Sequence, residues 1–229
     1  MMQRQLILSS LLIVAAINNV FGQKIEALSN TINLDTVKTN KTNNIFVGID
    51  ASTPIQSIYS DKSGLQGFVS YQFKQKWVAI AELGFEKNKF NENSWKVDVD
   101  GIYGKIGLNW FINQDPTNIL NGFYVGGRFA YSSFNQTLNE FPIRDIYSNT
   151  IVDYGNLPKS KVSSYWVEVV VGGRVELYKN LYADFSIHPA IYLGGKKQNN
   201  IDHLVIPGYG RNNGPFNLPL FFGISYKLL

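Results

Sequence analysis

Ser186 and His188 are the residues whose types and spacing come closest to a catalytic site. Residues two apart in an extended strand share a face, so the hydroxyl and the imidazole can meet. Glu168 or Asp184 can orient the imidazole, and a nucleophile, a base and a carboxylate are the parts of an acyl hydrolase. The spacing is unspecific, however, and a hydrogen-bonded histidine inside the protein is the commoner explanation. We therefore expect that the protein is not an enzyme, and keep a hydrolase as the least favoured alternative.

Metal, phosphate and nucleic-acid chemistry find little support in the sequence. His203, beside Asp202, is the only other histidine, and the chain has no cysteine. This is a weak ligand set, so we expect no metal and no cofactor. Gly126-Gly127 and Gly172-Gly173 are not phosphate loops, because no helical pattern follows either pair. A net charge of +4 is too small and too scattered to indicate nucleic-acid binding.

The elements that must position these residues are strands. Eight segments of alternating apolar and polar residues follow Asn44 and run to the last residue. Each has about the ~10 residues that a tilted strand needs to cross a bilayer. We predict strands near residues 45–52, 65–73, 77–87, 96–112, 122–134, 163–177, 181–193 and 216–229. In 77–87 the alternation is clear, with Trp77 and Leu83 on one face and Glu82 and Glu86 on the other.

Charged residues gather on the polar face of these segments. The expected inward set is Asp50, Glu82, Glu86, Lys105, Arg128, Glu168, Arg174, Glu176, Asp184 and Lys227. Charge at mid-strand cannot face hydrocarbon, so this face must line the interior. Side chains can fill an eight-stranded barrel, so we expect a charge network that plugs the lumen, with Arg128 and Arg174 as its hubs. A narrow, porin-like pore for small solutes is the alternative.

The links between the segments are alternately short and long. Tight connections lie near residues 74–76, 114–121 and 178–180, and longer ones at 53–64, 88–95, 135–162 and 194–215. This asymmetry predicts an all-β, eight-stranded antiparallel up-and-down transmembrane β-barrel. A soluble ligand-binding barrel would have the reverse arrangement, polar outside and apolar inside. Aromatic residues near the strand ends fit interfacial girdles: Phe73, Trp77, Trp110 and Tyr226 at one rim, Tyr131 and Phe134 nearer the other.

The N-terminal residues predict export. Arg4 precedes an apolar stretch over residues 6–17, and Gly22 offers a small residue for cleavage. We therefore predict a cleaved signal peptide at 1–22, a polar periplasmic lead-in at 23–44 and the barrel at 45–229. The expected location is the outer membrane of a gram-negative bacterium.

Specific function is expected in the long loops, because binding residues are often carried on loops held by a rigid frame. The segment 135–162 is more apolar than a solvated loop, and either packs on itself as a cap or extends the neighbouring strands. In the last loop, Tyr209 and Arg211 lie among glycines and are candidates to bind a sugar or a partner protein. A plain turn-rich loop is the commoner explanation of this composition. Expected partners are outer-membrane lipid and an extracellular protein or glycan; the sequence does not define an oligomeric state.

Three stretches carry a resemblance to a known family: YVGGRFAYSSFNQTL at 124–138, WVEVVVGGRVELYKNL at 166–181 and LVIPGY at 204–209. They resemble small outer-membrane barrel proteins of unknown function from gram-negative bacteria. The resemblance covers most of the barrel and implies a barrel and an outer-membrane location. It implies no substrate.

Overall fold

The computed structural model describes residues 43–57, 61–214 and 216–229. The predicted signal peptide and nearly all of the predicted lead-in lie outside these residues. Within the described part of the chain, no helix has the length and apolar character needed to cross a membrane.

The described residues form twelve strands and one short helix. In chain order they are β1 (Asn44–Asp50), α2 (Ser52–Gln56), β2 (Lys62–Lys74), β3 (Trp77–Glu92), β4 (Trp95–Gln114), β5 (Gly122–Arg144), β6 (Ile151–Tyr178), β7 (Leu181–Ile187), β8 (Ala190–Lys196), β9 (Val205–Ile206), β10 (Gly210–Arg211), β11 (Phe216–Asn217) and β12 (Leu220–Lys227).

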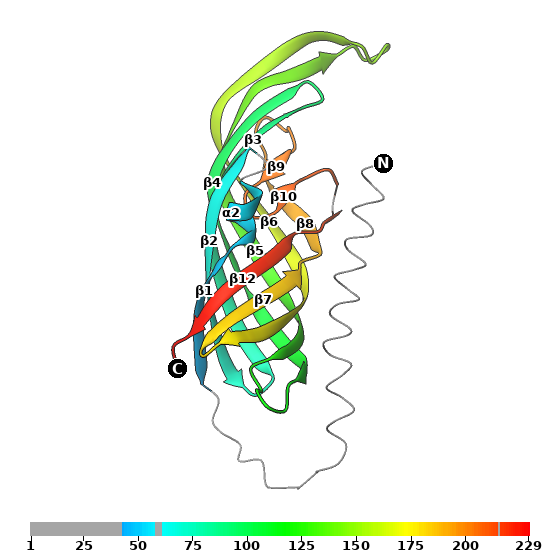
Figure 1. Ribbon diagram of the computed structural model, residues 1–229. Coiled ribbons are helices and arrows are strands. Elements are labelled where there is room, and N and C mark those ends of the chain that lie inside the picture. The colour runs from blue at the N-terminus through cyan, green and yellow to red at the C-terminus, as the bar shows by residue number, and fades with distance from the viewer. Residues whose placement is uncertain (1–42, 58–60, 215) are drawn as a thin grey trace, which may run out of the picture. The chain divides into compact units, whose positions relative to one another are not determined.

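The main sheet closes into a ring. Strands β1 to β6 pair antiparallel in sequence order, β6 then pairs with β7 and β8, and β12 pairs with both β7 and β1 (Figure 1). β7 and β8 together form one strand path beside β6. Ile187 of β7 lies opposite Val171, and Ala190 of β8 lies opposite Glu168, so the register on β6 is the same for both strands.

Two prolines explain the breaks. Pro189 separates β7 from β8, and Pro219 separates β11 from β12, because proline has no N–H to donate to a ladder. Backbone bonds still cross here, from His188 N–H to the Pro219 carbonyl at 2.9 Å and from Val169 N–H to the Pro189 carbonyl at 2.9 Å. The ring therefore has eight strand paths, and the predicted eight-stranded antiparallel up-and-down barrel is confirmed.

The two faces of the barrel follow the predicted alternation. Glu82, Lys105 and Glu168 are buried in the lumen, whereas the outward Leu83 is 73% and Ile102 is 65% exposed. Phe134, predicted in an outer girdle, is buried instead. It has the parity of Ala130 and Ser132 on β5, so its side chain points into the lumen.

Short turns lie at one end of the barrel, here called the turn end, and longer connections at the other, the loop end. At the loop end, most residues of the predicted loops 88–95 and 135–162 belong to strands. β3 and β4 continue to a tight turn at Asn93 and Ser94, both with positive φ (53° and 66°). β5 and β6 continue beyond the ring to Arg144 and Ile151, so the second option for segment 135–162 is correct (Figure 1).

Aromatic and aliphatic clusters fill the lumen at several levels. Phe46, Leu120 and Tyr182 pack together near the turn end, with Val78, Phe111, Tyr124 and Val170 as a second cluster. Phe68, Ile80 and Phe221 form a third cluster. The largest cluster, which includes Tyr103, Trp166 and Tyr209, lies at the loop end. The barrel therefore encloses a packed interior.

Candidate functional site

A plug loop, residues 204–211, fills the mouth of the barrel at the loop end. It contains the small β9–β10 hairpin, in which Val205 and Ile206 are fully buried. The Gly208 N–H donates to the Glu86 carboxylate at 3.1 Å. The Tyr209 ring packs edge-on against Trp166 with the centroids 5.6 Å apart. The loop is therefore held by a hydrogen bond from the barrel wall and by aromatic packing.

Glycine is required at the tip of the plug loop. Gly208 has a φ of +79°, and a Cβ built on it would lie 2.5 Å from the Tyr103 ring. Any side chain here would force the loop away from the wall, because both the backbone conformation and the space are restricted.

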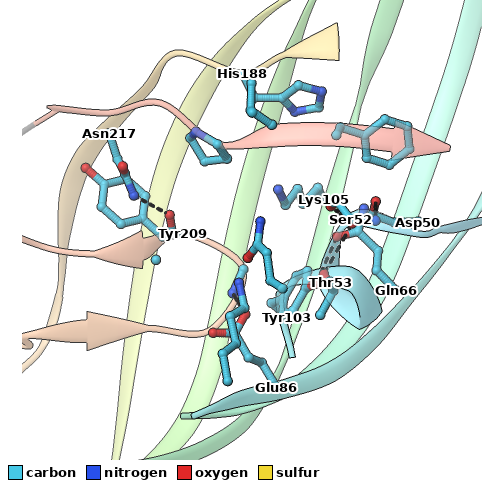
Figure 2. A pocket seen from close by; sticks show the side chains of 17 residues that line it. Asp50, Ser52, Thr53, Gln66, Glu86, Tyr103, Lys105, His188, Tyr209 and Asn217 are labelled. Carbon is cyan, nitrogen blue, oxygen red and sulfur yellow. Dashed lines mark hydrogen bonds and ion pairs between the residues drawn. The ribbon is translucent and has the colours of Figure 1, made fainter. Parts of the chain in front are cut away.

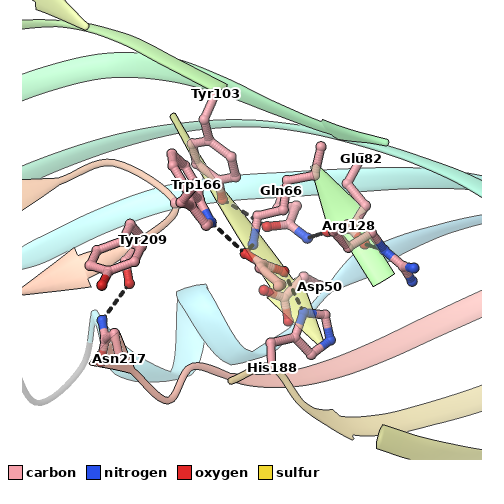
Figure 3. Close-up of polar contacts among 12 residues, drawn as sticks. Asp50, Gln66, Glu82, Tyr103, Arg128, Trp166, His188, Tyr209 and Asn217 are labelled. Atoms are coloured by element: carbon pink, nitrogen blue, oxygen red, sulfur yellow. Dashed lines mark hydrogen bonds and ion pairs between the residues drawn. The ribbon is translucent and has the colours of Figure 1, made fainter. Parts of the chain in front are cut away.

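Ion pairs connect the strands below the plug loop. Lys105 Nζ lies 2.8 Å from Glu168 Oε1, and Arg128 Nε lies 3.0 Å from Glu82 Oε1. Tyr103 donates to Gln66 Oε1 at 2.8 Å, and Gln66 in turn donates to Glu82 at 2.9 Å (Figure 3). These buried charges have the opposite partners that low-dielectric surroundings require.

The two arginines named as hubs lie in separate clusters. Arg128 donates to Glu82, to Asn109 Oδ1 at 2.9 Å and to the Gly127 carbonyl at 3.0 Å. Arg174 Nε donates to both oxygens of Asp184, at 2.9 and 3.1 Å. Its guanidinium also lies 4.4 Å from the centroid of the Phe46 ring, close enough for a cation–π contact.

The remaining predicted charges have local roles or lie near the rims. Asp50 accepts the N–H of Ser52 at 2.8 Å, so it holds the start of α2 against β1. Glu176 accepts the Asn180 N–H at 2.9 Å in the β6–β7 turn. The half-buried Lys227 has no ion pair among the described residues.

Lys62 is an inward cation that sequence reasoning missed. Its ammonium lies 3.2 Å from Glu86 Oε2. The predicted strand begins at residue 65, but β2 begins at Lys62, and continuing the alternation upstream from Gln66 would have indicated the loop-end position of Lys62.

Ser186, His188 and Glu168 form a continuous hydrogen-bonded chain. Ser186 Oγ lies 2.8 Å from His188 Nε2, and His188 Nδ1 lies 2.8 Å from Glu168 Oε2. Trp166 Nε1–H donates to the other Glu168 oxygen at 2.8 Å. Of the two carboxylates considered from the sequence, Glu168 therefore orients the imidazole, whereas Asp184 pairs with Arg174.

A polar pocket of about 160 Å³ lies between the plug loop and the barrel wall, and includes Asp50, Gln66, Glu86, Lys105, His188 and Tyr209 in its lining (Figure 2). Ser186 is not in the lining and is only 1% exposed. A carbonyl group entering this pocket therefore meets the imidazole and does not reach the hydroxyl, which acyl transfer requires.

The two loop residues predicted to bind a partner differ in position. Tyr209 is buried in the pocket, where its ring lies against Trp166 and Tyr192. Arg211 is exposed and forms an ion pair with Glu92, with its guanidinium 5.5 Å from the Phe90 ring. The binding role of both residues remains a prediction.

His203 is buried at the base of the plug loop. Its Nε2–H donates to the Lys196 carbonyl at 3.0 Å, and its Nδ1 lies 3.0 Å from the Ser164 hydroxyl. Burial lowers the pKa of His203 below its usual 6.5, against the smaller raising effects of the Lys196 carbonyl and Asp202. This histidine is therefore a structural support of the plug loop.

Together these features define an eight-stranded antiparallel barrel whose interior is filled by ion pairs, packed rings and an inserted loop. The chain belongs to the family described as a domain of unknown function (DUF6048), whose pattern matches residues 3–228.

Among solved structures, the chain is similar to Ail, the attachment invasion locus protein of Yersinia pestis, known from its crystal structure. The TM-score is 0.41 and the identity 10%, and the match covers 81% of this chain and 97% of that chain. No curated protein matches the sequence.

Proposed function

We propose that this protein is a non-enzymatic outer-membrane β-barrel of a gram-negative bacterium, with a closed lumen and a binding role carried by its extracellular end. The apolar outer surface carries this proposal. On β3 the outward residues are apolar from Trp77 to Phe85, and Lys87 is the first outward charge beyond them. Eight residue steps span about 26 Å along the strand and about 20 Å at the usual tilt, close to the ~25 Å band of such barrels.

The distribution of exposed residues supports a lipid environment. Leu83, Ile102 and Ile106 are each more than 60% exposed, and apolar residues occupy the outward positions on every side of the ring. A soluble protein rarely exposes apolar patches larger than a few hundred Å². Trp77 and Trp110 face each other across β3 and β4 at the turn end, where an interfacial girdle is expected.

The connections support one orientation of the barrel in the membrane. The turn end carries the tight β2–β3 and β6–β7 turns and the end of β12, whereas the β5–β6 hairpin and the plug loop lie at the loop end. Short turns face the periplasm and long connections face outside in outer-membrane barrels. The plug loop and the β5–β6 hairpin are therefore the parts offered to extracellular partners.

Gel mobility tests this proposal. Outer-membrane fractions are run in SDS without heating and after boiling, because closed barrels have no unpaired edge and resist SDS until heated. We expect the protein in the outer-membrane fraction, with a mobility that changes on boiling. A soluble periplasmic protein with one mobility would contradict the proposal.

A lipid-modifying hydrolase is the second candidate function. The hydrogen-bonded Ser186–His188–Glu168 chain favours it, whereas the burial of Ser186 outside the pocket lining argues against it. Mass spectrometry of outer-membrane lipids would compare wild type, Ser186→Ala and His188→Ala, with the gel shift as the check on folding. Loss of a lipid product in both variants would support the hydrolase. Unchanged lipid profiles in correctly folded variants would eliminate it.

A further inference from the structure

A shallow apolar groove of about 480 Å³ lies on the outer face of the barrel, over β2 to β5. Its upper row contains Leu65, Phe85 and Ile102, which are opposite one another in the ladder. The row below contains Leu83 between Gly67 and Gly104, and Tyr131 lies opposite Gly104 on β5. The groove is therefore a gap in the outer surface with apolar walls.

Two outward glycines make the gap, and internal packing does not require them. A Cβ on Gly67 would meet no atom closer than 3.6 Å, and one on Gly104 would lie 3.2 Å from a flexible Leu83 methyl group. By contrast, a Cβ on the inward Gly101 would lie 2.2 Å from Phe134. Glycine weakens a strand interior and is often found where a ligand approaches closely. Gly67 and Gly104 both lie opposite Leu83, so together they open a groove that a single outward glycine does not.

A positive charge lies directly beyond the groove, at the loop end. Lys87 is the outward residue after Phe85 on β3, and it makes no ion pair within the described part of the chain. Asp100 is opposite Lys87 in the ladder, but its carboxylate already accepts from Lys159 at 2.8 Å and from Asn135 at 2.9 Å. The Lys87 ammonium therefore lies near the Asp100 carboxylate at the level where the apolar belt ends, and forms no ion pair with it among the described residues.

We propose that this groove binds one acyl chain of a phosphate-bearing lipid of the outer leaflet, with Lys87 binding the phosphate. The proposal rests on the membrane insertion proposed above. The lipid is favoured as occupant because the groove is apolar, lies in the last two rows of the belt and ends at an ammonium group. This arrangement matches an acyl chain below a charged headgroup.

Retention of such a lipid must come from shape and charge. An acyl chain leaves one apolar environment for another when it moves from the bilayer to the groove, so the hydrophobic effect contributes little to the difference. The remaining contributions to binding are close packing against the concave wall and the contact between Lys87 and the phosphate. Both can be removed separately by substitution.

Native mass spectrometry of the whole barrel in mild detergent tests the proposal, with bisphosphorylated lipid A and its dephosphorylated form as probes. Gly104→Leu fills the groove and should lower binding of the bisphosphorylated probe by at least about fivefold, because overpacking costs ~1–3 kcal/mol. Lys87→Gln should lower it by about two- to fivefold, as expected for an exposed charge pair. The wild-type barrel should bind the dephosphorylated form less tightly by a similar factor.

Gly127→Leu is the matched control. Gly127 is an outward glycine on β5 outside the groove, and a Cβ there would meet only a backbone oxygen at 3.7 Å. Binding should be unchanged in this variant. Equal loss in Gly127→Leu and Gly104→Leu would mean general annular lipid and would overturn the proposal.

A second filling variant and the gel shift make the outcomes distinguishable. Gly67→Leu fills the groove from the other side of Leu83. If Gly104→Leu does not fold, Gly67→Leu replaces it in the test and should show the same loss of lipid binding. A normal heat-dependent shift with unchanged lipid binding in the filling variants would overturn the proposed lipid site and leave the proposed function standing. Absence of the shift in the wild-type protein would overturn both the groove and the proposed function.

Discussion

At the scale of single residues, alternation predicts which charges face inward but not which charges meet. Lys105 is opposite Glu82 in the β3–β4 ladder, and Arg128 is opposite Glu168 in the β5–β6 ladder. The ion pairs nevertheless join Lys105 to Glu168 and Arg128 to Glu82. The direction of long side chains within the lumen decides the pairing, so strand order and register would not have been enough to predict it.

Removing one member of this group should destabilise the barrel strongly. Arg128→Ala leaves Glu82 buried without its cation, and we expect a loss of about 3–5 kcal/mol in the free energy of unfolding. Urea unfolding in lipid vesicles would measure it. The control is the double variant Glu82→Leu/Arg128→Met, which replaces both charges by apolar groups and should recover most of the loss. Equal destabilisation in the single and double variants would argue against an uncompensated charge as the cause.

Gly208 gives a second prediction at this scale. Gly208→Ala should release the plug loop, because its positive φ costs an L residue about 1–2 kcal/mol and its Cβ would meet the Tyr103 ring. Limited proteolysis of the folded barrel should cut the loop faster in this variant. Asn213→Ala, at an exposed position just after the same loop, should be cut at the wild-type rate. Equal rates in all three proteins would mean that Gly208 does not hold the loop.

At the scale of elements, the ring strands were predictable because inward and outward residues alternate along each strand of a closed barrel. The continuation of β5 and β6 beyond the ring was not predictable, because the predicted strands stop where the membrane is expected to end. Local hydrogen bonds stabilise the tip of this β5–β6 hairpin, where Asp145 accepts the N–H groups of Tyr147 and Ser148 at 2.9 and 2.8 Å. The insertion of residues 204–211 was also missed, since contacts such as Gly208 with Glu86 are far apart in sequence.

The plug loop should loosen in acid through His203. Its pKa is lowered in the closed loop, so the open loop binds the proton more readily, and closure is fully favoured only above the ordinary pKa of 6.5. As the pH falls below 6.5, protonation should favour opening, because Nδ1 can no longer accept from the Ser164 hydroxyl. Hydrogen exchange of residues 204–211 at pH 5 and pH 7.5 should show faster exchange in acid, after correction for the intrinsic rates.

His203→Gln is the control for this pH effect. The amide can donate to the Lys196 carbonyl but does not titrate, so the difference between the two pH values should disappear. An unchanged acid effect in His203→Gln would assign it to another group.

At the scale of the whole molecule, several layers close the lumen, and each is made from different strands. The plug loop covers the mouth, the Lys105–Glu168 and Arg128–Glu82 pairs lie below it, and the aromatic clusters continue to the turn end. An eight-stranded barrel has room for side chains and little else. We therefore expect closure of the lumen to follow from the strand number and the inward residues together, and not to depend on one gate.

This layering predicts the electrical behaviour of the protein. In planar bilayers we expect no steady channels from the wild-type barrel and none after residues 204–211 are replaced by a short glycine–serine link, because the ion pairs and clusters below remain. The heat-dependent gel shift would verify that the shortened barrel is folded. Steady channels in the wild type would favour the narrow pore over the closed barrel. Channels in the shortened barrel alone would make the plug loop a gate, with the layers below it too loose to stop ions.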